Sequence, residues 1–215
     1  MIILFDLDST LSTIEGFDEI GRKKGVYEEV VAATQKTMDG DIPFAEAFAN
    51  KLQILKPSQK DVLWLVDLYK KSVEKNAYET VKKLSDMKDI KVGILSNNLD
   101  IAVKEFGKFL SLSEDLCIGV KAAFDDQGEY LGLDEEDPLA YDGGKGKIIE
   151  KIKKQTSEKI IFIGDSKADM DAGVFSDLFI GYGGVIERDK VVRNAPHFAH
   201  NMNEVLKIIS KIFLK

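Results

Sequence analysis

Short apolar runs alternate along this chain with segments in which the apolar positions recur at helical spacing. The first run, residues 2–7, stops at acidic residues, as a strand buried in a parallel sheet would. Further strands are predicted at residues 90–95, 159–164 and 178–184. Helices are predicted at residues 76–87, 101–110, 145–154 and 168–175. This alternation predicts an α/β fold, with a Rossmann-like parallel sheet and helices on both of its faces.

The segment between the first two strands differs, because it carries helical signals and few strand signals. Amphipathic helices are predicted at residues 17–25, 27–40, 43–55 and 62–69. An insertion of about 60 residues is too long for a simple crossover. We therefore interpret residues 15–75 as a helical cap on an α/β core formed by 1–14 and 76–215. Within the core, apolar alternation on both sides of GEYLG, at 118–124 and 130–133, predicts a small hairpin.

Composition and charge narrow the range of partners. The chain has 215 residues, of which 44% are hydrophobic, enough for one domain or for a core with a modest insertion. Its formal net charge is -7 and its acids are scattered, so it repels polyphosphate backbones and is not expected to bind nucleic acid. A phosphorylated substrate must therefore be attracted locally, by a metal ion, a lysine or backbone N–H groups.

No sequence pattern in this chain points to a membrane or to an oxidising compartment. Cys117 is the only cysteine, which excludes an internal disulfide. The opening MIILFDLD lacks the basic region of a signal peptide, and no apolar run approaches the ~20 residues of a membrane helix. Basic and apolar residues alternate in the C-terminal VLKIISKIFLK, which predicts a helix packed on the core rather than one on a membrane surface. We expect a soluble cytoplasmic protein with no membrane partner; its oligomeric state is open, with a homodimer one option.

Two carboxylates follow the first predicted strand, where open parallel sheets bind their ligands. Asp6 and Asp8 stand two residues apart on an extended segment, so both point to one side, which suits a divalent cation. One can attack phosphorus to form an aspartyl-phosphate, and the other can serve as general acid and base. The alternative is that these acids only cap the next turn.

Two more clusters suit a phosphate group. Ser96, Asn97 and Asn98 follow a predicted strand and offer a hydroxyl and backbone N–H groups, although these residues are also common in turns. Lys145 lies in the glycine-rich stretch 143–147 before a helix, where it can neutralise charge at phosphorus. The spacing required for a Walker P-loop is absent.

The fourth cluster is acidic and follows the strand predicted at 159–164. Asp165 can complete the oxygen shell of a hard cation, and Asp169, one helical turn further on, can be a ligand or support one. By itself this could be a loop acid that caps a helix. Together, the four clusters favour metal-assisted phosphoryl chemistry.

The segments DLDST, LSNN, GGKGK and GDSKAD, in this order, resemble the motifs of the haloacid dehalogenase (HAD) superfamily. The longer stretches DIPFAEAFANKLQILKPS, GEYLGLDEEDP and IGYGGVIERDKVVRNA are similar to its phosphoserine phosphatase family, and the similarity covers nearly the entire chain. The resemblance implies a HAD core with a helical cap. It also implies an Mg²⁺-dependent phosphomonoesterase that hydrolyses O-phospho-L-serine through an aspartyl-phosphate, a step of L-serine biosynthesis.

The same resemblance implies roles for individual residues. Asp6 would be the nucleophile and Asp8 the general acid and base. Mg²⁺ would be held by Asp6, the backbone carbonyl of Asp8 and Asp165, with Asp169 in support. The phosphoryl group would be bound by Ser96, the N–H of Asn97 and Lys145. In the cap, Glu15 would face the substrate ammonium group, with Met38 and Phe44 screening water.

Three departures from the family pattern concern recognition of the substrate rather than hydrolysis. Asn97 and Asn98 stand where the family has two glycines, and two side chains there could crowd the pocket or change its polarity. Lys51 replaces the arginine that grips the substrate carboxylate, so it keeps the charge but loses the planar two-pronged fit. Ser166 and Ala168 differ in the last motif. A different small phosphorylated metabolite is therefore an alternative substrate. A slow phospho-aspartate switch and a phosphate-binding protein are weaker alternatives.

Overall fold

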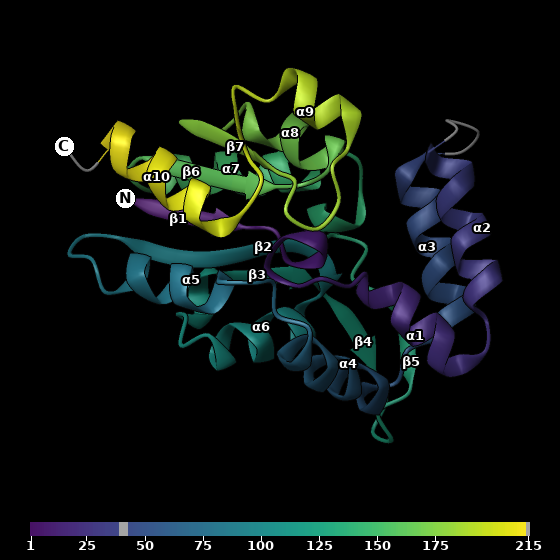
Figure 1. Ribbon diagram of the computed structural model, residues 1–215. Coiled ribbons are helices and arrows are strands. Elements are labelled where there is room, and N and C mark those ends of the chain that lie inside the picture. Colours follow the sequence, from purple (N-terminus) through teal and green to yellow (C-terminus); the bar gives the residue numbers. More distant parts are fainter. Residues whose placement is uncertain (39–42, 214–215) are drawn as a thin grey trace.

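The computed structural model describes residues 1–38 and 43–213, and a six-stranded sheet forms its centre (Figure 1). The strand order is β3-β2-β1-β6-β7-β8, and all neighbours run parallel. The strands are β1 (Ile2–Phe5), β2 (Lys91–Leu99), β3 (Cys117–Val120), β6 (Ile160–Gly164), β7 (Leu178–Tyr182) and β8 (His197–Ala199). The α/β fold class predicted from the sequence is confirmed.

The central strands are apolar because both faces of the sheet are covered. All residues of β1 and β6 are buried, as expected for parallel strands between two layers of helices. In the ladder, Phe5 lies level with Ile94 of β2 and with Ile163 of β6. Residues that follow these positions therefore emerge together at the carboxyl edge of the sheet.

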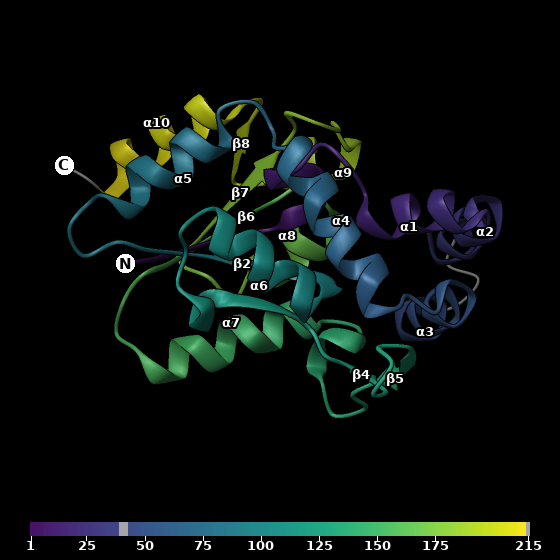
Figure 2. The same ribbon diagram turned by 90° about the horizontal axis from the view of Figure 1, so that it is seen from below.

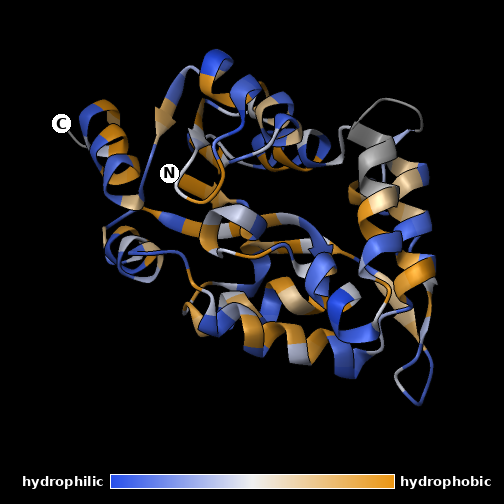
Figure 3. Cartoon of the chain, turned by 45° about the vertical axis from the view of Figure 1, so that its right-hand side comes forward, coloured by the Kyte–Doolittle hydropathy of each residue, from blue (hydrophilic) through white to orange (hydrophobic). Residues whose placement is uncertain are grey.

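Helices cover the two faces of the sheet. On one face α5 (Ala77–Ser85) lies beside α10 (Met202–Phe213), and on the other α7 (Gly144–Gln155) lies beside α8 (Lys167–Gly173) (Figures 1 and 2). The predicted C-terminal helix does pack on the core, since α10 buries Met202, Val205 and Ile209. Figure 3 shows hydrophobic residues along the strands and on one side of these helices. Within the described residues, none of the helices is both long and apolar enough to cross a membrane.

The insertion after β1 is helical, as predicted. It contains α1 (Gly16–Lys24), α2 (Tyr27–Met38), α3 (Phe44–Leu55) and α4 (Gln59–Lys71). Helices α1 to α3 stand beyond the carboxyl ends of the strands, at the right of Figure 1. Helix α4 instead packs along α6 (Asp100–Phe109), with the rings of Tyr69 and Phe106 5.7 Å apart. The last part of the insertion thus reaches back to the sheet layer.

The predicted hairpin exists, but its first run contains two strands. β3 joins the edge of the main sheet, and only β4 (Ala122–Phe124) pairs antiparallel with β5 (Tyr130–Leu133). The chain changes partner at Lys121, whose N–H donates to the Asp137 carboxylate at 2.8 Å. Continuous apolar alternation cannot reveal such a switch. Strand β8 and helix α9 (Asp189–Asn194), only three and six residues long, were not predicted.

Candidate active site

The structure brings the four predicted clusters to the carboxyl edge of the sheet. The reason is the strand register, which sets the ends of β1, β2 and β6 side by side. The residues are Asp6 and Asp8 after β1, Ser96, Asn97 and Asn98 in β2, Lys145 in the first turn of α7, and Asp165 and Asp169 around the start of α8.

Lys145 joins two of the acids in the buried centre of the site. Its Nζ lies 2.6 Å from Asp6 Oδ1 and 2.6 Å from Asp169 Oδ1. Burial by itself lowers the pKa of Lys145, but the two carboxylates outweigh burial and raise it, so the ammonium stays charged. The glycine-rich sequence allows this placement. Gly143 has φ of 70°, and a Cβ on Gly144 would lie 2.0 Å from the Pro138 carbonyl oxygen.

Three buried carboxylates are grouped as a cation site would require. Oxygens of Asp6, Asp165 and Asp169 all lie within 4.8 Å of one another. Burial raises the pKa of Asp6 well above its ordinary value, although Lys145 opposes the change, and burial with Asp169 raises that of Asp165 to about 6. An all-oxygen donor set with surplus negative charge fits a hard divalent cation such as Mg²⁺. The residues present therefore fit the predicted metal.

Asp169 is held by the start of its own helix. Its N–H donates to Ser166 Oγ at 3.1 Å, and the Ser166 N–H donates to Asp169 Oδ2 at 3.0 Å, which forms a capping box. This leaves Oδ1 directed at Lys145. Ser166, one of the departures in the last motif, thus orients an acid of the site.

Asp8 occupies a second polar cluster, separate from Lys145. Its Oδ1 accepts hydrogen bonds from the Gly16 N–H, at 2.8 Å, and from the Tyr69 hydroxyl. Its Oδ2 accepts one from Asn98 Nδ2 at 3.2 Å. Burial raises the pKa of Asp8, against the effect of these three donors. Burial and Asp8 also raise the pKa of Tyr69 well above its ordinary value, so its hydroxyl keeps the proton that it donates.

Both asparagines of the second motif use their side chains inside the protein. Asn97 Nδ2 donates to the Leu139 carbonyl at 2.7 Å, and Asn98 donates to Asp8. Ser96 is buried, and its Oγ accepts from the Asn98 N–H at 3.1 Å. The amide groups are therefore engaged with neighbouring residues of the protein.

The predicted substrate contacts of the insertion are described only in part. Glu15 accepts from Ser9 Oγ at 2.7 Å, and burial and Asp8 raise its pKa to about 7. Burial lowers the pKa of Lys51, whereas the nearby carboxylates of Asp18, Glu15 and Asp8 oppose this change. Lys51 therefore interacts electrostatically with acids of the site. The side chains of Met38 and Phe44 lie outside the described residues.

Sequence reasoning missed two residues of the site. Arg188 lies before α9, with its Nε 2.8 Å from Asp165 Oδ2 and its guanidinium 3.5 Å from Glu15. It belongs to the stretch IGYGGVIERDKVVRNA, whose similarity was noted without a role for any residue. Tyr69 was placed only in an amphipathic helix. Its partner Asp8 is 61 residues away, and no local pattern marks that contact.

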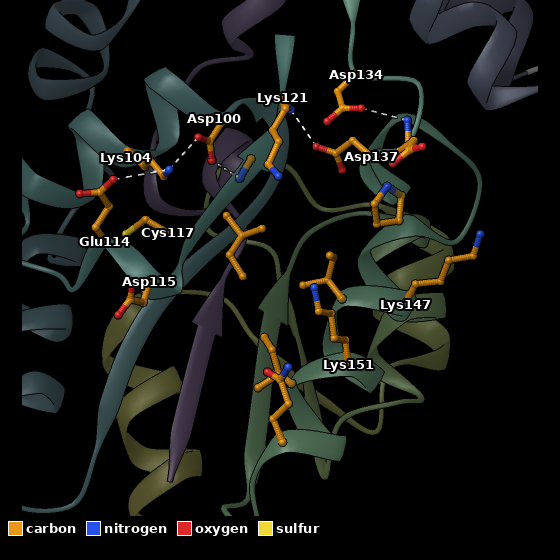
Figure 4. Close-up of a pocket in the computed structure, with 17 residues that line it drawn as sticks. Asp100, Lys104, Glu114, Asp115, Cys117, Lys121, Asp134, Asp137, Lys147 and Lys151 are labelled. Atoms are coloured by element: carbon orange, nitrogen blue, oxygen red, sulfur yellow. Dashed lines mark hydrogen bonds and ion pairs between the residues drawn. The ribbon is translucent and has the colours of Figure 1, made fainter.

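One cavity borders predicted site residues, and a larger one does not. A small cavity of about 150 Å³ borders the phosphate-binding candidates, with Asn97, Gly144 and Lys145 in its wall. A larger one, of about 790 Å³, lies beside the edge strand β3 (Figure 4). None of the predicted site residues is among the described residues that line the larger cavity, and its Lys104 is paired with Asp100 and Glu114. We therefore assign the chemistry to the carboxyl edge of the sheet, where Asn97, Gly144 and Lys145 line the small cavity.

Known proteins share this architecture. A profile of the haloacid dehalogenase-like hydrolases matches residues 1–176. The chain is 33% identical over 205 residues to the phosphoserine phosphatase of Homo sapiens, covering 95% of this chain and 91% of that protein. Among solved structures, a phospho-aspartyl intermediate analogue of phosphoserine phosphatase has a TM-score of 0.80 at 29% identity, covering 96% and 97% of the two chains. A phosphoserine phosphohydrolase-like protein from Francisella tularensis has a TM-score of 0.84 at 25% identity, covering 96% and 98%.

The chain therefore belongs to the haloacid dehalogenase-like hydrolase family. Within that family it is similar to the phosphoserine phosphatases along nearly its whole length, and it is a phosphoric monoester hydrolase. The family and the enzyme class predicted from the sequence are confirmed.

Proposed function

We propose that this phosphatase is Mg²⁺-dependent and hydrolyses O-phospho-L-serine, with Asp6 as the nucleophile. The observation that carries the proposal is the buried contact of Asp6 with Lys145 beside Asp165 and Asp169. A carboxylate next to a fixed cation and a candidate metal site can attack a phosphoryl group whose charge is neutralised from two sides.

The reaction has two steps. The Asp6 carboxylate attacks phosphorus in line, the bond to the leaving oxygen breaks, and Asp8 gives that oxygen a proton. Asp8 then takes a proton from water, which attacks phosphorus and releases phosphate from Asp6. Lys145, Ser96 and the Asn97 N–H stabilise the phosphoryl oxygens. Asp6, the Asp8 carbonyl and Asp165, with support from Asp169, would hold Mg²⁺, which would supply Lewis-acid neutralisation of the phosphoryl charge when bound.

The substrate is assigned from the relatives and from the insertion. Two of the similar proteins named above, the human protein and the phospho-aspartyl intermediate analogue, are phosphoserine phosphatases. Glu15 offers a carboxylate for the ammonium group of an amino-acid ester, and Lys51 offers an ammonium for its carboxylate. We treat residues 15–75 as a cap that closes over the substrate and excludes water. Met38 and Phe44 remain proposed contacts at its border.

Phosphate release from a panel of esters with Mg²⁺ tests the substrate. We expect O-phospho-L-serine to exceed its D-enantiomer, phosphothreonine, phosphoethanolamine and an aryl phosphate in kcat/KM. Lys51→Met should lower kcat/KM for phosphoserine by about 10-fold or more, through a lost charged contact, and change phosphoethanolamine little because that ester has no carboxylate. Equal activity on all esters would keep the mechanism and reject the amino-acid substrate in favour of a different metabolite.

Removal of the metal tests the cofactor. We expect a chelator to reduce activity to background and added Mg²⁺ to restore it, since three buried carboxylates surround the site. A second measurement does not need turnover: saturating Mg²⁺ should raise the melting temperature of the wild type by several degrees through binding to the folded state. Asp165→Asn should lose most of that shift. An equal shift in this variant would place the metal elsewhere.

A further inference from the structure

We infer that Tyr69 and Asn98 act as a clamp on the Asp8 carboxylate, fixing the orientation in which it transfers protons, so that Tyr69 is a positioning residue of the reaction. The inference rests on the proposed function, because it takes Asp8 as the general acid and base. Tyr69 lies in α4 and Asn98 in β2, so two distant parts of the chain meet at one catalytic side chain.

The clamp holds both oxygens of Asp8 and also closes on itself. Tyr69 donates to Oδ1, and Asn98 Nδ2 donates to Oδ2 at 3.2 Å. The same Nδ2 donates its other hydrogen to the Tyr69 hydroxyl at 2.7 Å. A carboxylate gripped at both oxygens by two groups that also grip each other cannot rotate without breaking several hydrogen bonds.

The two clamp residues are themselves fixed. The Oδ1 of Asn98 accepts from the Leu99 N–H at 2.8 Å, which determines which end of its amide faces Asp8. Asn98 is 1% exposed and Tyr69 is fully buried, with its ring against Phe106. Their donors are therefore pre-organised rather than free to follow solvent.

The space around the clamp is full. A Cβ placed on Gly16 would lie 2.0 Å from the Tyr69 hydroxyl and 2.5 Å from Asn98 Nδ2. The Gly16 N–H gives Oδ1 its second hydrogen bond, at 2.8 Å. With two donors on Oδ1 and one on Oδ2, the lone pair left for the transferred proton is on Oδ2. The clamp thereby selects one oxygen of Asp8 for the chemistry.

Tyr69→Phe removes the hydroxyl and keeps the ring, and a matched control exists. Tyr182 is also fully buried, and its hydroxyl donates to Glu74 at 2.8 Å, in a contact separate from Asp8. We expect Tyr69→Phe to lower kcat about 10-fold or more while KM stays within about twofold, as loss of a hydrogen bond to a charged group predicts. Tyr182→Phe should leave both constants unchanged.

A second readout separates positioning from loss of structure. With an aryl phosphate, the leaving group needs no proton, so attack by Asp6 continues while activation of water by a loose Asp8 slows. Acid quenching in the steady state should therefore trap a larger fraction of Tyr69→Phe than of wild type or Tyr182→Phe as aspartyl-phosphate. Tyr69→Phe combined with Asn98→Ala should cost less than the product of the single effects, because the two act as a unit.

The outcomes are distinguishable. If wild type is active through a phospho-enzyme but Tyr69→Phe matches Tyr182→Phe in kcat and in trapped phospho-enzyme, the clamp is refuted and the proposed function stands. Independent, multiplicative effects of Tyr69→Phe and Asn98→Ala would likewise overturn the joint clamp. If wild type forms no phospho-enzyme, the proposed mechanism fails and the clamp fails with it.

Discussion

Asp6→Asn is expected to lower kcat by roughly 10⁴-fold or more and to abolish the phospho-enzyme, because an amide nitrogen has no free lone pair for attack on phosphorus. The geometry makes the loss specific to chemistry. Lys145 keeps its 2.6 Å contact with Asp169, so the buried cation retains a partner. Phosphate release over long incubations, together with acid quenching after mixing with radiolabelled substrate, measures both effects.

The fold of this variant should survive. Removing one acid from a site with three grouped carboxylates relieves repulsion, so the melting temperature should not fall by more than a few degrees. Asp67→Asn is the control, since Asp67 is 69% exposed in α4 and pairs only with Lys70 among the described residues. Asp67→Asn should match the wild type in kcat, in trapped phospho-enzyme and in melting temperature. Full turnover by a folded Asp6→Asn variant would show that another group is the nucleophile.

Asp8→Asn is expected to lower kcat by about 10² to 10⁴-fold and to stall the reaction at the second step. With an aryl phosphate, Asp6 can still attack, so one equivalent of the phenol should appear in a burst. The aspartyl-phosphate should then accumulate because no base activates water. With phosphoserine, whose alkoxide leaving group needs a proton, the burst should be absent. Rapid quenching with both esters checks this pair of results.

In Asp8→Asn, the side-chain amide also changes the hydrogen bonds around residue 8. Its oxygen can keep the hydrogen bonds from Gly16 and Tyr69, but its nitrogen would face the Asn98 amide nitrogen, donor against donor. Asn98 or the new side chain must turn, at a small cost in stability. Unchanged steady-state turnover with phosphoserine would contradict the assignment of Asp8 as acid and base.

Strands and helices of the core were predictable because their signals are local. Buried parallel strands are continuously apolar, as β1 and β6 are, and the helices show one apolar face. The sequence predictions failed where a strand is defined by the strand it pairs with rather than by its own residue pattern. The alternation across Lys121 is uniform, yet the chain leaves one sheet there and enters another. The three-residue strand β8 is too short for any periodicity.

For the site, the sequence by itself determined the four clusters and their order, because acids, serine, lysine and glycines at strand ends are visible in one dimension. It also located them at one edge, since parallel strands share a carboxyl end. Only the tertiary structure decided which groups touch: Lys145 on Asp6, Arg188 on Asp165, and Tyr69 with Asn98 on Asp8. These contacts span up to 139 residues of chain. They depend on helix packing and strand register, which no local spacing encodes.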